Sequence, residues 1–283
     1  MDAALYRSLA FVPASSARFL EKARTMRADI VCLDLEDSVR AEEKAAARRM
    51  ARAALASRHE ARVFVRTNAP STVQMRADIG AVARRGLDGV VIPKVGSAAQ
   101  VRSVARALSG LERARGLRRL EIIPSIESAA GAVACAEIAA ASPRVRAVVF
   151  GIFDLMHDMG MEGAPNEGAE HARAQVPLHA RAGGAVAIDS IWQDLRSASG
   201  LARDCRRGRS LGYAGKSVIH PAQLPAVHRA FAPTRAELDW AGRVREAYEA
   251  PGGRGAMRVG GMMVDEVHYR QALALLAAAE RPS

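Results

Sequence analysis

Two acidic residues, Glu127 and Asp154, follow two short apolar runs of the chain. These runs, 120–124 and 147–150, are typical of buried strands, and an amphipathic stretch, 129–141, lies between them. In a parallel sheet or barrel, such a strand–helix–strand unit brings both carboxylates to the same C-terminal edge. Mg²⁺ is held in proteins by one or two carboxylates, with water and substrate oxygens completing the octahedron. The spacing therefore fits a divalent-ion site, and it fits equally well two carboxylates that cap a helix and a loop.

Charged residues of both signs follow the other predicted strands or lie at their C-terminal ends. Besides the two acids above, they are Glu36, Asp37, Arg66, Lys94, Asp189 and Lys216. Catalytic groups gather at this rim in a TIM barrel. The planar fork of Arg66 suits a substrate carboxylate, and an ion pair with Glu36 or Asp37 is a compatible second role. Lys94 is expected as a charge partner of the acids or in a structural salt bridge, and Asp189 as a residue that orients a neighbour or caps the next helix.

Strand and helix signals alternate along the first 220 residues. The predicted strands are 8–12, 30–33, 62–66, 89–92, 120–124, 147–150, 185–189 and 213–219. Each is followed by a helix or by a loop with helical content, which indicates a TIM (β/α)₈ barrel as the catalytic domain, 1–220. A doubly wound sheet is the alternative fold, but no GxGxxG phosphate loop follows any predicted strand.

The pattern changes after residue 220. Helices are predicted over 221–231 and 234–250, an extended piece over 258–265 and a last helix over 268–279. We interpret 221–283 as a C-terminal helical extension that packs on its own barrel or reaches a neighbouring subunit.

Composition excludes several classes of protein. Hydrophobic residues make up 49% of the 283 residues, which excludes a disordered chain, and no apolar run is long enough to span a bilayer. No signal peptide is recognised at the start, and three scattered cysteines fit a reduced, cytoplasmic protein. The formal net charge is +11, yet the basic residues are spread along the chain and only 4% of residues are aromatic. Nucleic-acid binding is therefore disfavoured, whereas a basic surface favours anionic substrates.

A set of short motifs runs in order along almost the whole chain. The motifs are RSLAFVPASS (7–16), CLDLEDSV (32–39), VRTN (65–68), VIPKV (91–95), IESAAG (126–131), FGIFDL (150–155), AID (187–189), GYAGKSVIHPAQL (212–224) and GMMVDEV (261–267). With these motifs the chain resembles the citrate lyase β-subunit-like branch of the HpcH/HpaI aldolase family. That branch includes malyl-CoA and citramalyl-CoA lyases.

The resemblance implies a fold, an activity and a metal. Members of the family are TIM barrels that use Mg²⁺ and form trimers or hexamers. They cleave or form a C–C bond between an α-keto acid and an acyl thioester carried by coenzyme A or an acyl carrier protein. The resemblance implies that Glu127 and Asp154 are the metal ligands, whereas their spacing alone leaves the metal site and the capping roles open.

The resemblance also implies roles for four further residues. Arg66 resembles the residue that grips the keto-acid carboxylate, and Glu36 and Asp37 resemble groups near metal-bound water. Asp265, in the tail motif, resembles a catalytic acid/base that closes over the site of a neighbouring subunit. The extension is therefore expected at a subunit interface.

Departures from the family pattern leave the substrate open. Phe153 stands where the family often has an acidic residue, Val267 stands where a proline is frequent, and the loop after Asp154 is short and rich in methionine. Two other functions are compatible with the sequence. One is a class II aldolase that acts on free hydroxy-keto acids. The other is a non-catalytic paralogue that binds a metal, a metabolite or nucleic acid.

Overall fold

The computed structural model describes residues 6–163, 169–250 and 255–280, and eight parallel strands among them close into a barrel. In barrel order the strands are β1 (Ser8–Pro13), β2 (Ile30–Asp34), β3 (Arg62–Arg66), β4 (Gly89–Ile92), β5 (Glu121–Ile126), β6 (Ala147–Phe150), β7 (Val186–Asp189) and β8 (Gly215–Val218). Strand β8 pairs with β1, which completes the circle. The expected (β/α)₈ barrel is confirmed, with each predicted strand within two residues of its observed start.

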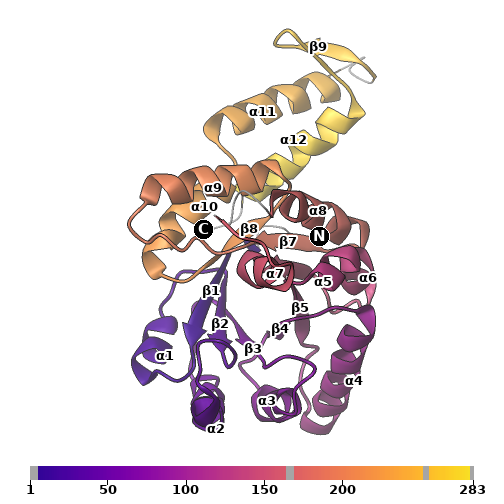
Figure 1. Ribbon diagram of the computed structural model, residues 1–283. Coiled ribbons are helices and arrows are strands. Elements are labelled where there is room, and N and C mark those ends of the chain that lie inside the picture. The colour runs from indigo at the N-terminus through magenta and orange to yellow at the C-terminus, as the bar shows by residue number, and fades with distance from the viewer. Residues whose placement is uncertain (1–5, 164–168, 251–254, 281–283) are drawn as a thin grey trace. The chain divides into compact units, whose positions relative to one another are not determined.

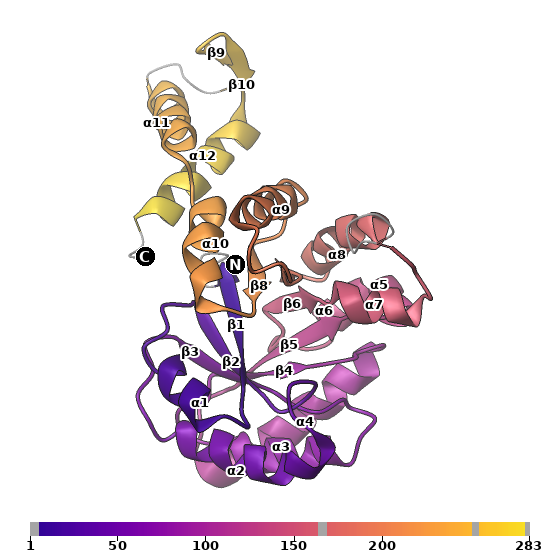
Figure 2. The ribbon, with the colours of Figure 1, turned by 60° about the vertical axis from the view of Figure 1, so that its left-hand side comes forward.

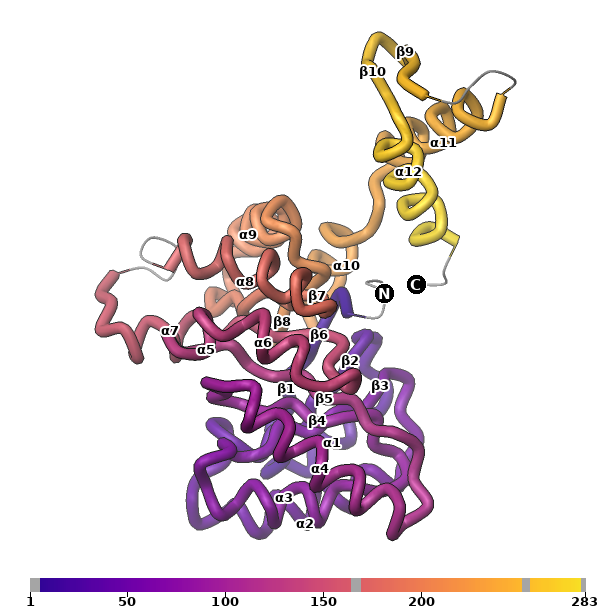
Figure 3. The backbone as a smooth tube through the Cα atoms, turned by 90° about the vertical axis from the view of Figure 1, so that its right-hand side faces the viewer, coloured from indigo at the N-terminus to yellow at the C-terminus, as the bar shows by residue number. Residues whose placement is uncertain are grey.

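Helices follow the strands and lie outside the barrel (Figure 1). They are α1 (Ala17–Ala23), α2 (Lys44–Ala54), α3 (Gln74–Val82), α4 (Ala98–Arg115), α5 (Ala129–Val133), α6 (Cys135–Ala140), α7 (Ile152–Asp158), α8 (Glu170–Ala182), α9 (Ala198–Ser210) and α10 (Leu224–Phe231), with short 3₁₀ turns at Ala41–Glu43 and Pro221–Gln223. Figure 3 shows α2, α3 and α4 side by side along the outer surface. The single helix expected over 129–141 is two helices, because Ala134 leaves helical geometry at ψ 7°. No helix in the described parts of the chain is both long and apolar enough to cross a lipid bilayer.

The barrel interior is filled by alternate residues of the strands. Leu9, Ile30, Phe64, Ile123 and Ile188 belong to one buried cluster, and its members on β2, β6 and β7 are two residues apart, as one face of a strand requires. The positions between them face the surrounding helices. Because side chains alternate, the residue two positions after the last inward apolar residue of a strand also points inward. It lies at the C-terminal mouth of the barrel. That geometry decides which rim residues share a site.

A second compact unit comprises Phe231–Ser283, and the first comprises Met1–Ala230. In the second unit α11 (Arg235–Glu249) packs against α12 (Glu266–Ala279), and β9 (Met257–Val259) pairs antiparallel with β10 (Met262–Val264) (Figure 2). Gly260 and Gly261 join the two strands with φ of 56° and 85°, as a tight hairpin turn requires. The extended piece expected over 258–265 is thus a hairpin. Most of α10, expected in the extension, belongs to the first unit.

Four charged side chains are buried together between β7, β8 and the helices outside them. Arg173 Nη2 lies 2.6 Å from Asp189 Oδ2, and Arg173 Nη1 lies 2.9 Å from Asp204 Oδ1. Lys216 Nζ lies 3.0 Å from Asp189 Oδ2 and 2.5 Å from Asp204 Oδ2. Two cations and two acids therefore balance one another, and each is at most 8% exposed.

The position of this cluster corrects an expectation from the sequence. Asp189 and Lys216 were expected among the charged groups of the rim, but both face outward toward the helices. The inward positions beside them are Ile188 and Ser217, since side chains alternate along a strand. Asp189 does orient a neighbour, because its Oδ1 accepts a hydrogen bond from the backbone N–H of Ser190.

Replacing Lys216 by alanine should lower the free energy of unfolding by about 3–5 kcal/mol, because it leaves two buried carboxylates short of a partner. Urea denaturation followed by circular dichroism measures the loss. The matched control is Arg24→Ala, which removes an exposed pair with Glu21 and should cost about 1 kcal/mol or less. Equal losses in the two variants would contradict the role given to the cluster.

Candidate active site

Strands β2 and β3 end in a paired acid and base. Asp34 and Arg66 are partners in the strand register, and both point into the barrel mouth. Arg66 Nε and Nη2 each donate to one oxygen of Asp34 at 2.7 Å, and the guanidinium lies 4.7 Å from the ring centre of Phe11. Burial alone would raise the pKa of Asp34, but the Arg66 guanidinium holds it below its ordinary value. Sequence reasoning missed Asp34, although its place at the end of β2, level with Arg66, was a usable signal.

The remaining nitrogen of Arg66 and the ammonium of Lys94 lie among further acids. Arg66 Nη1 is 3.1 Å from Glu36 Oε2 and 3.5 Å from Asp37 Oδ2. Lys94 Nζ is 2.8 Å from Glu36 Oε1, 3.4 Å from Asp37 Oδ1 and 3.9 Å from Asp154 Oδ1. The structure thus brings together the residues expected at this part of the rim, and Lys94 is a charge partner of the acids.

Glu127 and Asp154 line the same cavity and reach it from different kinds of element. Glu127 follows the last residue of β5, as expected, whereas Asp154 lies in the first turn of α7. The backbone N–H of Lys94 donates to Glu127 Oε1, and the φ of Lys94 is 54°, in the left-handed region. A Cβ atom on Gly151 would lie 2.6 Å from Glu127 Oε2, so only glycine lets the carboxylate lie against this backbone.

The cationic side chains of this site do not balance the charge of its carboxylates. Burial and, to a smaller extent, the charges of Asp154 and Glu36 together raise the pKa of Glu127 to about 8. Burial also raises the pKa of Glu36 to about 7, although Arg66 and Lys94 oppose the shift. Oε2 of Glu36 is buried and makes no well-formed hydrogen bond, even with Arg66 nearby.

These observations fit a divalent cation. With Asp34 and Asp37, the site holds five carboxylates against two cationic side chains. Within the described ranges, no three His, Cys, Asp or Glu side chains form a ready metal-binding group. Mg²⁺ needs only one or two carboxylates, because it keeps water and substrate oxygens among its ligands, and Glu127 and Asp154 offer two in one cavity.

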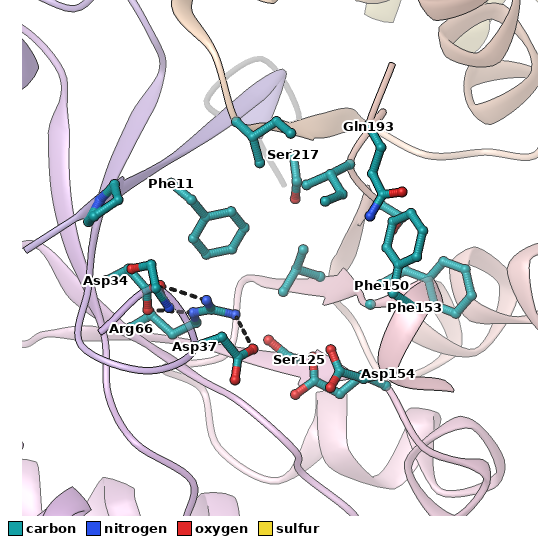
Figure 4. A pocket seen from close by; sticks show the side chains of 18 residues that line it. Phe11, Asp34, Asp37, Arg66, Ser125, Phe150, Phe153, Asp154, Gln193 and Ser217 are labelled. Atoms are coloured by element: carbon teal, nitrogen blue, oxygen red, sulfur yellow. Dashed lines mark hydrogen bonds and ion pairs between the residues drawn. The ribbon is translucent and has the colours of Figure 1, made fainter. Parts of the chain in front are cut away.

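The cavity has a volume of about 450 Å³ and two unlike sides (Figure 4). Arg66, Asp37 and Asp154 lie on one side, and Ser217 lies across the cavity from them. Aromatic and aliphatic side chains complete the wall: Phe11, Val149, Phe150, Phe153, Ile191 and Ile219. Sequence reasoning did not single out the hydroxyls of the wall. The sequence could have pointed to these hydroxyls, because they lie at inward-facing strand positions near the rim.

Asp265 is not among the described residues that line this cavity, and it belongs to the second unit of the chain. It caps α12, and its Oδ1 accepts from the backbone N–H of Val267 at 3.0 Å and lies 2.7 Å from His268 Nδ1. The hydrogen bond with His268 lowers the pKa of Asp265. His220 accepts a hydrogen bond from the backbone N–H of Ala222 at 3.1 Å.

The family model for HpcH/HpaI aldolase/citrate lyase matches residues 7–221. The chain belongs to this family. It is 36% identical to a (3S)-malyl-CoA thioesterase of Cereibacter sphaeroides (strain KD131 / KCTC 12085) over 97% of this chain and 95% of that protein. It is 34% identical to the citrate lyase subunit beta of Escherichia coli (strain K12) over 97% and 93% of the two chains. The crystal structure of protein CitE from Mycobacterium tuberculosis in complex with magnesium, acetoacetate and coenzyme A has a TM-score of 0.83 and 33% identity, covering 99% of this chain and 100% of that one.

Mg²⁺ affinity should rise with pH and level off above about pH 8, because Glu127 must lose a proton before it can bind the ion. Calorimetric titration in two buffers of different ionisation enthalpy measures both the affinity and the released proton. Without Mg²⁺, the free energy of unfolding should fall between the ordinary Glu pKa and about pH 8, since the folded state holds a proton that the unfolded chain releases. Mg²⁺ affinity that is independent of pH would argue against Glu127 as a ligand.

Proposed function

We propose that the chain is a Mg²⁺-dependent carbon–carbon lyase that acts on a 3-hydroxyacyl thioester of the citryl-, malyl- or citramalyl-CoA type. The products, or the substrates in the reverse direction, are an acyl thioester and an α-keto acid. The observation that carries this proposal is the excess of carboxylates beside one guanidinium in a cavity at the C-terminal end of the barrel. Relatives named as citrate lyase subunit beta, and CitE bound to magnesium and coenzyme A, support the lyase activity, the metal and this carrier.

The site residues divide the work of binding. Glu127 and Asp154 hold the ion, and Mg²⁺ when bound supplies Lewis-acid polarisation of the substrate oxygen beside the scissile bond. Arg66 binds the carboxylate of the keto acid, and its bonds to Asp34 fix the plane of its guanidinium. Glu36 and Asp37 keep Arg66 and Lys94 in place and accept hydrogen bonds from water near the ion.

In the cleavage direction, a base takes the proton of the 3-hydroxyl group and the C–C bond breaks. The keto acid forms, and the electron pair of the bond passes to the acyl thioester as its enolate. Asp265 then donates a proton to the enolate carbon, a contribution of typically about 10²–10⁴-fold. At its exposed place on α12 the pKa of Asp265 is lowered, so it needs the dry surroundings of a neighbouring subunit to hold a proton near neutral pH.

A homotrimer or hexamer supplies those surroundings in this proposal. The hairpin next to Asp265 presents apolar side chains to solvent, with Met262 53% and Met263 68% exposed, and Val267 is 70% exposed. Such a surface is suited to burial against another subunit. The extension therefore packs at a subunit interface and carries Asp265 to the cavity of its neighbour.

We also infer a reducing, cytoplasmic setting. Cys32, Cys135 and Cys205 are all buried as free thiols. Burial raises the pKa of each thiol, which keeps it protonated and unreactive. Cysteines of this kind serve as small apolar residues and need no oxidising compartment.

Asp154→Asn should abolish Mg²⁺-dependent cleavage, because it removes one of two carboxylate ligands. The assay follows keto-acid formation and free thiol release from malyl-, citramalyl- and citryl-CoA in parallel. Asp158→Asn on the same helix is the matched control, since Asp158 accepts a hydrogen bond from the backbone N–H of Ala129 and does not line the cavity. Undiminished turnover by Asp154→Asn contradicts the proposal, and release of thiol without keto acid would indicate a thioesterase.

Mixing two inactive variants tests whether Asp265 acts across subunits. Glu127→Gln and Asp265→Asn should each be inactive, while subunits mixed in equal amounts should regain about a quarter of full activity in a ring of head-to-tail contacts. The gain arises because one subunit supplies an intact cavity and its neighbour an intact Asp265. Glu127→Gln mixed with Asp154→Asn is the control and should regain none. If mixed Glu127→Gln and Asp265→Asn subunits regain no activity, Asp265 acts in the site of its own subunit or takes no part in the reaction.

A further inference from the structure

The hydroxyl of Ser217 is a buried polar group without a partner. Ser217 lies on β8 between the outward-facing Lys216 and Val218, so its side chain faces the barrel interior. It is 2% exposed, lines the cavity, and its Oγ makes no hydrogen bond. Figure 4 shows it across the cavity from Arg66 and Asp154. Because a buried hydroxyl normally finds a partner, this one points to an oxygen that a ligand brings.

A second hydroxyl of the wall is already used by the protein. Oγ of Ser190 accepts a hydrogen bond from the backbone N–H of Ile152 at 3.2 Å, at the start of α7. Ser190 therefore holds the helix that carries Asp154. Ser217 has no such task, and its donor and acceptor positions both remain open to a ligand.

The surroundings of Ser217 make a hydrogen bond there strong. The cavity that Ser217 lines has several apolar side chains in its wall, with Phe11, Ile191 and Ile219 among them. Among the described residues that line the cavity, Arg66 is the sole cationic side chain, and its guanidinium already contacts Asp34, Glu36 and Asp37. The hydroxyl of Ser217 is itself buried, and a fixed donor away from bulk water stabilises developing negative charge far better than it does in water.

The oxygens of the substrate can be assigned to the two sides of the cavity by elimination. The carboxylate goes to Arg66, and the oxygen beside the scissile bond goes to the side that Glu127 and Asp154 occupy. The thioester carbonyl oxygen is left for the opposite side, where Ser217 lies. This oxygen gains negative charge when the C–C bond breaks and the enolate forms.

We propose that Ser217 is a further catalytic residue, whose hydroxyl donates a hydrogen bond to the thioester oxygen and stabilises the enolate. This inference rests on the proposed lyase function. Ser217 keeps its proton throughout: the hydroxyl proton of the substrate goes to the base, and the electron pair of the broken bond goes to the enolate. The contribution of Ser217 is therefore electrostatic, and it is larger in the transition state than in the bound substrate.

Ser217→Ala should lower kcat by about 10²-fold and leave the KM for the keto acid nearly unchanged, because one donor to a developing oxyanion is lost. Ser217→Thr, which keeps the hydroxyl, should recover at least about tenfold of that loss. Thermal melting should not fall in Ser217→Ala, since the hydroxyl has no partner to lose. An unchanged kcat in Ser217→Ala overturns the inference, as does a Thr variant no better than Ala.

A second measurement separates this inference from the lyase function. Exchange of the acetyl protons of acetyl-CoA for deuterium, followed by NMR in D₂O with Mg²⁺ present, reports enolate formation without C–C cleavage. The wild type should catalyse the exchange, and Ser217→Ala should slow it by a factor similar to that on kcat. If no thioester is cleaved but exchange is lost in Ser217→Ala, the lyase function fails and the role of Ser217 stands. If the wild type shows no exchange, or Ser217→Ala exchanges equally fast, the role of Ser217 is wrong.

Discussion

Repulsion among carboxylates is the constraint on which the site depends. Glu36, Glu127 and Asp154 would separate if they were free, and burial makes their charges more costly than in water. Strand ends and the first turn of a helix hold them in place, while Arg66 and Lys94 offset part of the charge. In the proposed function, the unbalanced negative charge attracts the divalent ion.

The fold could be predicted from the sequence because it depends on a repeated pattern. Eight apolar runs with helical segments between them leave few arrangements other than a closed parallel barrel. Helix ends were less predictable, since the break at Ala134 and the hairpin turn at Gly260 are local backbone events. Most of α10 belongs to the first unit, although its helical pattern in the sequence continues that of the extension.

Site residues could be predicted from the sequence where their charge marks them. They were harder to predict where the direction of the side chain from its strand determines whether it reaches the cavity. Glu127 and Arg66 were singled out as charged residues at the ends of apolar strands, and both line the cavity. Asp189 and Lys216 carry the same signal, and a one-residue difference in register turns them outward into a neutral cluster. Ser217 was overlooked because a serine in a strand has no charge to draw attention. Its significance comes from the missing hydrogen bond, which only coordinates can show.

The acidic cavity lies in a chain whose net charge is +11, so the excess of positive charge belongs to residues outside the site. Exposed charges act through solvent and are screened over about 10 Å at 0.1 M salt, whereas buried charges are screened much less. Arrival of an anionic thioester and retention of the ion are therefore governed by different parts of the molecule. Raising the ionic strength slows the first by weakening long-range attraction and leaves the second largely intact.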